Sequence, residues 1–453
     1  MVFHASLLTL CRGLRTDRKP SVVKQKAVFH KSVAAKTCRW LPVALLFAFL
    51  PSMAMAQPGT WTLESAIRRA MEIAPEMRAA DAEVTAREAE LTQAGNWPNP
   101  TIDLRADDRL GQEDGRGGTD FTQFALSQPL PLRRVSRERA VAEARLAGAG
   151  EGRRLRRLEL ERLAAQVFHE LQRAQAKLEL ARARLKETES YPGAGGARDR
   201  LVRYLAPLER ARLAILREEA NQAVAAAERE REQALIAFHA RLALPADAAA
   251  EASPLAEPPA PDALEALERN LDNHPWLAAA RKEQEAAEAN IAAAQSQRFA
   301  DPALNLFRER DVLAGGRRDV TGVGLSVQLP LWNTNPGIVD KARAEALRAR
   351  TELDIARRDT TARLRRSHAE LTRARVQAGR VRANLLEPAQ RLDELARRSF
   401  AAGEANVLAL IDAANSYFEA QARYVELLVQ AQGAAADLRF AAGQSLIAGE
   451  ATP

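Results

Sequence analysis

The chain has 453 residues, of which 47% are hydrophobic and only 5% aromatic, and its formal net charge is +7. Residues 1–56 hold 9 Lys or Arg and 1 acid, so 57 basic and 58 acidic residues remain beyond them. The positive charge is therefore confined to the N-terminus and does not indicate a nucleic-acid-binding protein. The shortage of large side chains predicts a thin core, as in bundles of long helices.

Residues 1–56 are predicted to be a leader that contains a signal peptide. Basic residues precede the apolar run 41–50, and the small residues 54–56 stand before Gln57, as a cleavage site requires. The alternative is a transmembrane anchor, for which this apolar run is short. A secretory leader would carry the rest of the chain out of the cytoplasm.

The rest of the chain carries the same landmarks twice, about 200 residues apart. The matching segments are Pro75 with Pro275, NPTIDL (99–104) with DPALNL (301–306), and LSQPLPL (126–132) with LSVQLPL (325–331). In each copy two short strand patterns lead into a long helical pattern. Two strands cannot close a sheet, so we expect an assembly whose wall is built from repeats.

The predicted elements follow this duplication in chain order. The first repeat, 57–244, contains predicted helices over 62–93, 134–189 and 200–243 and strands over 99–106 and 121–129. A linker rich in Pro and Ala follows over 245–262. The second repeat, 263–443, contains predicted helices over 263–297, 337–400 and 405–442 and strands over 301–308 and 320–329, before a C-terminal tail over 444–453.

The long helical patterns have the spacing of coiled coils. Val167, Leu171, Ala174 and Leu178 alternate steps of four and three, which is the 3.5-residue period of a packed seam. Many seam residues are Ala, which allows close approach of helices. Gly-containing turns at 191–197 and 400–405 interrupt the pattern, so each long stretch is predicted to be a helical hairpin.

The strand patterns alternate apolar and polar residues, which predicts one oily and one polar face. The predicted lipid-facing residues are Ile102, Leu104, Phe124, Leu126, Leu304, Leu306, Val323, Leu325 and Val327. Aromatic residues at or near the strand ends, such as Trp97 and Trp332, match the interfacial belt of a membrane barrel. The alternative is a pair of surface hairpins on a soluble protein.

A membrane barrel would require several copies of this chain. Four strands cannot enclose a pore, and an open strand edge cannot face lipid. Prolines stand where each second strand ends and the chain continues into a helix, at Pro129, Pro131 and Pro330. Proline ends the hydrogen-bonded ladder because it has no N–H to donate.

With these features the sequence resembles the outer membrane efflux protein (TolC) family over nearly all of 57–443. The resemblance rests on the paired LSQPLPL and LSVQLPL segments, the duplicated strands that begin with Asn-Pro or Asp-Pro, and the stretch 400–428. It implies a mainly α-helical fold with a small β part. In this family three protomers form an α-helical barrel through the periplasm and pool four strands each into a twelve-stranded outer membrane β-barrel.

The resemblance also implies partners and a substrate class. A periplasmic adaptor protein and an inner-membrane efflux pump, of the RND type, would complete the exporter. The segments QPLPL (128–132) and LPLWNTNPG (329–337) resemble the cation-efflux, CzcC-like branch, which implies export of heavy-metal cations. The alternatives are a multidrug or a type I protein-secretion duct.

The hairpin tips and one acidic residue are the candidate functional sites that the resemblance suggests. The expected adaptor-docking tips comprise Gly193, Gly196, Gly403, Glu404 and Asn406. Asp412 matches one of two acids that form a ring at the periplasmic entrance of some members, but Ala409 replaces the other. Ala405 stands where some gates carry an Arg, so the gate's bonding scheme cannot be transferred. Asp412 remains a gate candidate, with a solvated outer-face residue as the alternative.

No catalytic residues and no cofactor are predicted, because the sequence contains no P-loop, no GxSxG and no HExxH motif. Both cysteines, Cys11 and Cys38, lie in the leader, and the remaining histidines are far apart, so no metal ligands are assigned. Two function classes remain. One is a passive export duct in the cell outer membrane, and the other is a periplasmic coiled-coil scaffold without a pore.

Overall fold

Helices and strands occupy most of the described chain. The computed structural model describes residues 60–107, 121–191, 207–313 and 316–447, so the leader and the glycines Gly193 and Gly196 lie outside the described part. The first half contains α1 (Leu63–Ile73), α2 (Pro75–Ala94), β1 (Thr101–Asp107), β2 (Phe121–Pro129), α3 (Arg134–Ser190) and α4 (Pro207–Leu242). The second half contains α5 (Leu264–Arg269), a 3-10 turn (Leu271–Asn273), α6 (Pro275–Ser296), β3 (Ala303–Leu313), β4 (Gly316–Ser326), α7 (Pro336–Val381), a π-helical turn (Arg382–Leu386), α8 (Glu387–Ala401) and α9 (Val407–Ala441).

Three stretches predicted as continuous helices are interrupted. The region 62–93 divides at Ala74 into α1 and α2, and the region 263–297 divides before α6. In both cases a proline, Pro75 or Pro275, is the first residue of the second helix, where its missing N–H costs nothing. The region 337–400 contains a π-helical turn just before Pro388. The predictions of unbroken helices were wrong for 62–93 and 263–297, because proline cannot donate the hydrogen bond that continues a helix, whereas 337–400 stays helical through its π-helical turn.

All four strands form one antiparallel sheet in the order β1-β2-β3-β4. The two repeats therefore meet where β2 pairs with β3, with Leu126 opposite Leu306. The last strand was predicted over 320–329 but occupies Gly316–Ser326, so Val327 lies beyond its end. Within one chain the residues after Ser326 have no neighbouring strand to pair with, whereas the residues before Val320 continue the hairpin with β3.

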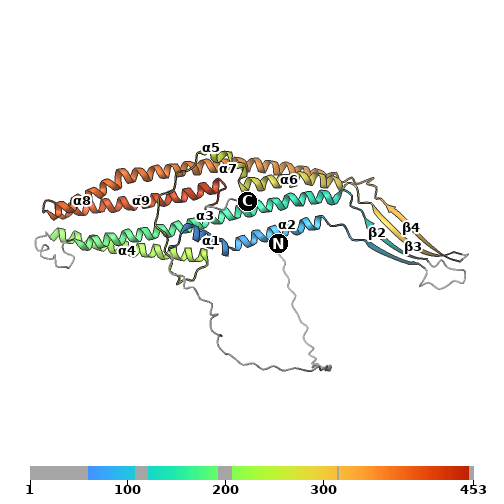
Figure 1. Ribbon diagram of the computed structural model, residues 1–453, viewed down its shortest axis with the longest axis horizontal. Coiled ribbons are helices and arrows are strands. Elements are labelled where there is room, and N and C mark those ends of the chain that lie inside the picture. Colours follow the sequence, from blue (N-terminus) through green and yellow to red (C-terminus); the bar gives the residue numbers. More distant parts are fainter. Residues whose placement is uncertain (1–59, 108–120, 192–206, 314–315, 448–453) are drawn as a thin grey trace, which may run out of the picture. The chain divides into compact units, whose positions relative to one another are not determined.

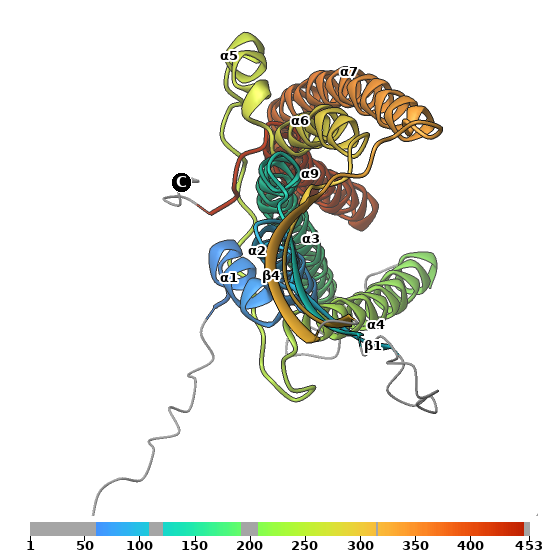
Figure 2. The same ribbon diagram turned by 90° about the vertical axis from the view of Figure 1, so that its right-hand side faces the viewer.

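The helices lie side by side, and the sheet continues from one end of them (Figure 1). Seen along the helices, they form a curved layer with α7 at one end and α4 at the other, and α1 and α5 lie on its convex side (Figure 2). α3 has 57 residues and spans about 85 Å at 1.5 Å per residue. No helix in the described ranges is both long and apolar enough to cross a membrane.

Small side chains dominate the contacts between the long helices. Along α7 the buried positions include Ala342, Ala346, Ala349, Ala356 and Ala378. Larger residues concentrate where α1 and α5 add a second layer, such as Phe168, Phe238 and Leu364. The helical part therefore has the thin core that its composition predicts.

A buried carboxylate fastens the C-terminal segment to this core. The side chain of Glu161 on α3 is 1% exposed and accepts hydrogen bonds from Ser445 Oγ at 2.8 Å and from the Leu446 amide at 2.7 Å. Arg157 donates to the same carboxylate at 3.2 Å. Ile447 then packs against Ile67 and Ala164. The segment predicted as a tail is thus, as far as Ile447, part of the core.

Candidate channel wall and gate

The sheet carries an exposed apolar face. Directly opposite residues of an antiparallel pair point to the same face, and the register joins Ile102 to Leu126, Leu126 to Leu306 and Leu306 to Val323. The same alternation places on this face all eight of the residues predicted to face lipid that lie within strands: Ile102, Leu104, Phe124, Leu126, Leu304, Leu306, Val323 and Leu325.

This apolar face is open in a single chain. Ile102 is 61% exposed, Leu104 75%, Val323 70% and Leu325 66%, while Leu126 is half-buried. Val327 is exposed as well, although it follows the end of β4. A large exposed apolar patch marks a surface made for a membrane or a partner. Contact of this face with lipid stays a prediction.

The opposite face of the sheet is polar and carries glycines. Its members include Thr101, Asp103, Arg105, Gln123, Ser127, Asn305, Glu309, Gly322 and Gly324. Phe307 is one of the apolar residues on this face, and its ring lies over Gly322, where an added Cβ would collide with the ring. The glycine therefore provides the space for an aromatic ring that covers the neighbouring backbone.

Proline and an ion pair between the repeats fix the connections between the sheet and the helices. Pro129 is the last residue of β2, and the next amide, that of Leu130, donates to the carbonyl of Pro302 at 2.7 Å. Arg134, the first residue of α3, bonds Asp301 at 2.9 Å. Pro131 and Pro330 follow β2 and β4 within the connections to α3 and α7, as predicted for strand–helix junctions.

The second hairpin tip has a well-defined turn. Gly403 adopts a positive φ of 78°, and the Glu404 amide donates to the Ser399 carbonyl at 2.8 Å, which closes α8 as a Schellman motif. Asn406 caps α9 by accepting from the Ala409 amide at 2.9 Å. Gly403, Glu404 and Asn406 are exposed. The first tip, with Gly193 and Gly196, lies outside the described residues.

Asp412 lies on an exposed stripe of α9. The neighbouring positions Ile411 and Ala413 are buried, whereas Asp412, Ser416 and Glu419 are exposed at helical spacing. The carbonyl of Asp412 accepts from Ser416 Oγ at 2.8 Å. The carboxylate therefore sits on the surface of the wall, in the first two turns after the tip.

A buried ionic cluster near the second tip was not predicted from the sequence. Arg397 on α8 bonds Glu187 of α3 at 2.5 Å and Asp393 at 2.8 Å, and the Tyr191 hydroxyl donates to Glu187 at 2.9 Å. Asp393 is only 4% exposed, and its Oδ1 has no hydrogen-bond partner among the described residues. Two buried carboxylates thus share one guanidinium, which ties the first hairpin to the second.

The environment of this cluster shifts the pKa values of two of its groups, Arg397 and Tyr191. Burial opposes the charge of Arg397, but its hydrogen bond to Asp393 and the charge of Glu187 raise the pKa of its guanidinium above the ordinary value. Burial and the neighbouring Glu187 also raise the pKa of the Tyr191 phenol. Arg397 therefore stays charged and Tyr191 stays a hydrogen-bond donor. A sequence signal exists only for Arg397, which lies four residues after Asp393.

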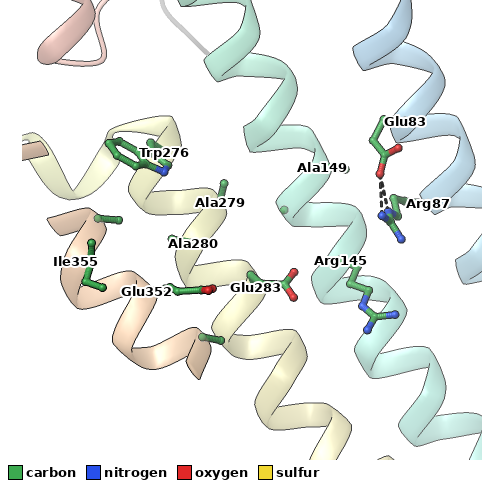
Figure 3. Close-up of a pocket in the computed structure, with 13 residues that line it drawn as sticks. Glu83, Arg87, Arg145, Ala149, Trp276, Ala279, Ala280, Glu283, Glu352 and Ile355 are labelled. Atoms are coloured by element: carbon green, nitrogen blue, oxygen red, sulfur yellow. Dashed lines mark hydrogen bonds and ion pairs between the residues drawn. The ribbon is translucent and has the colours of Figure 1, made fainter. Parts of the chain in front are cut away.

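A cavity of about 850 Å³ lies between α2, α3, α6 and α7 (Figure 3). Its charged lining consists of Glu83, Arg87, Arg145, Glu283 and Glu352. Glu83 and Arg87 form an ion pair at 2.8 Å, while Glu283 points from α6 towards α3, which carries Arg145 (Figure 3). No site residue predicted from the sequence lines this cavity.

The histidines serve the helices rather than a shared centre. His274 Nδ1 accepts from the Trp276 amide at 3.1 Å and Nε2 lies 3.1 Å from the Phe440 carbonyl, so His274 caps α6 and holds the end of α9. His169 is buried against Gln172 at 2.9 Å. Among the described residues, no group of three or more His, Cys, Asp or Glu side chains is arranged to hold a metal ion.

Sequence comparison with known proteins gives matches to outer membrane efflux proteins. Residues 266–444 match the family model described as outer membrane efflux protein. The cobalt-zinc-cadmium resistance protein CzcC of Cupriavidus metallidurans is 28% identical over 426 residues, which cover 87% of this chain and 97% of the relative. By these two matches the chain is similar to outer membrane efflux proteins along most of its length.

Solved efflux channels share the fold. CusC superposes with a TM-score of 0.64 at 18% identity, over 86% of this chain and 96% of that chain. The open state of the Neisseria gonorrhoeae MtrE outer membrane channel gives a TM-score of 0.64 at 20% identity, over 85% of this chain and 89% of that chain. The resemblance to this family and the mainly helical fold with four strands are thereby confirmed.

The similarity to outer membrane efflux proteins explains why the sheet has one apolar and one polar face. The chain is an outer membrane efflux channel protein and not an enzyme. An efflux channel needs an apolar surface toward lipid and a polar surface toward the transported solute. The sheet provides one face of each kind, and this assigns the function class of a channel rather than that of a scaffold.

Proposed function

We propose that three copies of this chain form the exit duct of a tripartite exporter for heavy-metal cations. The observation that carries this proposal is the register of the sheet, which puts eight apolar residues on one face and leaves both edges without a paired strand among the described residues. Such a sheet is stable in a membrane only as part of a closed barrel, since lipid offers no hydrogen bonds to a free edge.

The proposed orientation places the strands in the outer membrane and the helices in the periplasm. The second tip, with Gly403, Glu404 and Asn406, is the end of the hairpin farthest from the strands (Figure 1). This tip and the one that contains Gly193 and Gly196 dock a periplasmic adaptor, which links the duct to an inner-membrane pump of the RND type. An exposed cap on a rigid helical hairpin supports this assignment, because rigid elements hold an interface in a defined geometry.

The proposed substrate is a divalent heavy-metal cation. Support comes from the similarity to the cobalt-zinc-cadmium resistance protein over 97% of that protein's length. The duct itself is passive, and selection of the cation belongs to the pump and adaptor. A solute that passes through a wall with fixed charges feels their field most strongly where the passage is narrow.

Asp412 is the proposed selectivity residue at that narrow end. Three copies around a threefold axis would place three carboxylates close to the tip, which attracts cations and slows anions. Asp412→Asn should reduce the cation preference of the channel in planar-bilayer conductance and weaken block by multivalent cations. Equal ion selectivity in mutant and parent, measured with the channel open, would remove Asp412 from the pore.

A matched control separates a pore position from charge in general. Asp262 is also exposed but lies just before α5, on the convex side of the helical layer (Figure 2). Asp262→Asn removes the same charge and should leave ion selectivity unchanged. A similar change in both variants would indicate a long-range charge effect and not a ring of Asp412.

The substrate class is tested in cells. The chain should be expressed with the pump and adaptor encoded beside it, in a host that lacks its own metal exporters. The proposal expects higher tolerance to Co²⁺, Zn²⁺ and Cd²⁺, and loss of that tolerance when this chain alone is omitted. Tolerance gained only against organic dyes or detergents would assign the duct to drug export.

A further inference from the structure

The apolar face of the sheet changes its chemistry towards the end that lies away from the helices (Figure 1). Along β3 the residues on this face are Leu304, Leu306, Arg308 and Arg310 in turn, because alternate side chains of a strand share a face. The apolar face therefore ends in a basic pair within the same strand. The role of this pair rests on the proposed function, because only in a membrane would this face meet lipid.

The neighbouring strand β4 supplies one carboxylate to both arginines. The register puts Asp319 directly opposite Arg310, so the two side chains lie on the same face. Arg310 donates through Nε to Oδ1 of Asp319 at 2.8 Å and through Nη2 to Oδ2 at 3.3 Å. Arg308 Nη2 donates to the same Oδ2 at 3.4 Å. One carboxylate thus holds two guanidinium groups side by side, and one of their two positive charges stays uncompensated within this trio.

The trio is open to its surroundings. The side chains of Arg308, Arg310 and Asp319 are 65%, 47% and 41% exposed. A guanidinium carries several N–H donors in a planar fork, and the contacts with Asp319 use only part of them. Among the described residues no other acceptor bonds to the two guanidinium groups. Donors and positive charge are therefore available on the outer surface of the sheet.

The arginines lie at the height where an apolar band of membrane thickness would end. Arg310 follows Phe299, an exposed aromatic residue at the helical end of the sheet, by eleven residues. That length of chain reaches at most about 36 Å, or about 28 Å across a membrane at a strand tilt of about 40°, and the apolar band of an outer membrane barrel is about 25 Å tall. A lipid-facing Arg is strongly unfavourable at the midplane and nearly neutral at an interface. The pair therefore belongs at the interface, which in the proposed orientation is the outer one.

We propose that Arg308 and Arg310 bind a phosphate group of the phosphorylated glycolipid in the outer leaflet of the outer membrane. A phosphate monoester carries a charge of about −1.5 to −2 near neutral pH, which is opposite in sign to the charge that the trio leaves uncompensated. Arginine forks bind phosphate oxygens through paired, charge-assisted hydrogen bonds. Because the pair lies on the apolar face and not on the polar one, its ligand reaches it from the membrane and not from the pore.

Asp319 determines which anion this site accepts. It holds the two guanidinium groups close together before a ligand arrives, and such preorganisation lowers the cost of binding. It also competes with the ligand for their N–H donors. A phosphodiester, as in ordinary phospholipids, carries less charge and fewer free oxygens than a monoester and competes less well. The trio therefore favours a phosphate monoester on a sugar headgroup over the diester of a phospholipid.

The test is the affinity of the assembled protein for a defined glycolipid. The trimer is extracted from outer membranes in detergent, freed of bound lipid and titrated with bisphosphorylated lipid A in native mass spectrometry. Arg308→Gln combined with Arg310→Gln should weaken binding about tenfold or more, since a hydrogen bond to a charged group contributes about that factor. The parent protein should bind dephosphorylated lipid A equally weakly. This second measurement needs no substitution, so it tests the inference even where the double variant does not assemble.

A matched pair of arginines at the other end of the strands controls for charge. Arg133 and Arg298 are exposed and lie between the sheet and the helices α3 and α6. Arg133→Gln combined with Arg298→Gln removes the same charge and should leave the affinity for bisphosphorylated lipid A unchanged.

Each contrary outcome identifies what is wrong. Unchanged affinity in the variant of Arg308 and Arg310, equal binding of dephosphorylated lipid A, or equal losses in both double variants would overturn the inference. Phosphatidylglycerol bound as tightly as bisphosphorylated lipid A would assign the pair to phospholipid and overturn the glycolipid. Failure of the proposed function is distinct, because no trimer would then be recovered from outer membranes. Selective loss in the variant of Arg308 and Arg310, with weak binding of the dephosphorylated lipid, supports the inference.

Discussion

The sheet exposes its large apolar side chains, whereas the helical part buries its own. On the sheet, Leu104, Val323 and Leu325 are each at least 66% exposed. In the helices, Phe168, Phe238 and Leu364 are almost fully buried, and alanines fill the contacts between them. The helices also carry exposed leucines, such as Leu208 on α4, Leu347 on α7 and Leu395 on α8.

The two regions therefore differ in whether one chain alone can bury their apolar side chains and pair their strand edges. The helical part packs a core of its own, including the C-terminal segment held by Glu161. Under the proposed function, the sheet needs lipid for one face and further copies for both edges. Substitutions in the helical part should therefore change the stability of each protomer, and substitutions in the sheet should change membrane assembly.

The largest effect is expected from Glu161, which tests the self-sufficiency of the helical part. Glu161→Ala removes the partner of Arg157, Ser445 and the Leu446 amide and should lower the free energy of unfolding by about 3–5 kcal/mol. Chemical denaturation of the purified protein measures this. Glu159→Ala, which breaks a more exposed ion pair with Arg156, is the control and should cost about 0–1 kcal/mol. Equal effects would mean that Glu161 has no special structural role.

The sheet is tested by Leu325→Arg. A charged side chain at mid-height on the lipid face should cost about 2–4 kcal/mol and reduce the amount of assembled protein in outer membranes. Ser326→Arg places the same charge one residue along, on the polar face, and should assemble normally. If both variants assemble like the parent, the apolar face does not contact lipid, and the contrast between the two regions disappears.

Gly443 probes the junction between α9 and α6. Its φ is +71°, and an added Cβ would lie 3.1 Å from His274 Cδ2 and 3.2 Å from Pro275 Cδ. Gly443→Ala combines a left-handed backbone with crowding and should cost about 1–3 kcal/mol in thermal or chemical unfolding. Gly433→Ala, inside α9 with no atom within 4 Å of the added Cβ, should be neutral or stabilising by about 0.5–1 kcal/mol. The reverse order would contradict the described packing.

The smallest effect is a pH dependence of the helical part. Burial lowers the pKa of His274 below 6.5, and Arg363 adds to this, while the bond to Phe440 opposes it. The unfolded chain therefore binds the proton more readily than the folded chain. The stability contributed by neutral His274 is fully present above pH 6.5 and is lost as the pH falls through the lower folded pKa.

The measurement is stability as a function of pH. Protonation removes the lone pair on Nδ1 that accepts from the Trp276 amide. Because one group binds one proton, it can add a slope of at most about 1.4 kcal/mol per pH unit to the free energy of unfolding. His274→Gln should flatten the loss of stability below pH 6.5, and the remaining slope includes His169, whose pKa burial also lowers. An unchanged slope in the variant would show that His274 does not titrate in this range.

The sequence predicts the sheet faces better than the helix boundaries. The alternation of apolar and polar residues in 101–105 and 303–308 predicts the apolar face directly, because the direction of each side chain in a strand follows from its position. The break of the helix at Ala74 could not be predicted from Pro75, because a proline can either start a helix or interrupt one. The early end of β4 was not predicted because the length of a strand depends on the strand beside it, which the sequence pattern does not show.

The polar contacts of the helical part could not be predicted from one sequence. Glu161 and Asp393 look like solvated residues in Arg- and Glu-rich helices, and only packing against the C-terminal segment and α3 buries them. The partners of Arg397 and Arg134 lie 210 and 167 residues away, at Glu187 and Asp301. Spacing within one helix cannot indicate such contacts. For the site, the sequence indicates Gly403 and Asn406 by their turn chemistry, but not the ionic cluster beside them.

The central claim is that three copies share one barrel in the outer membrane. It is tested most directly by extracting outer membranes with detergent and measuring the mass of the native protein. The account predicts a particle of three chains that migrates as a trimer on unheated denaturing gels and as a monomer after boiling. A monomer recovered from the periplasmic fraction, or released from membranes by salt alone, would contradict it.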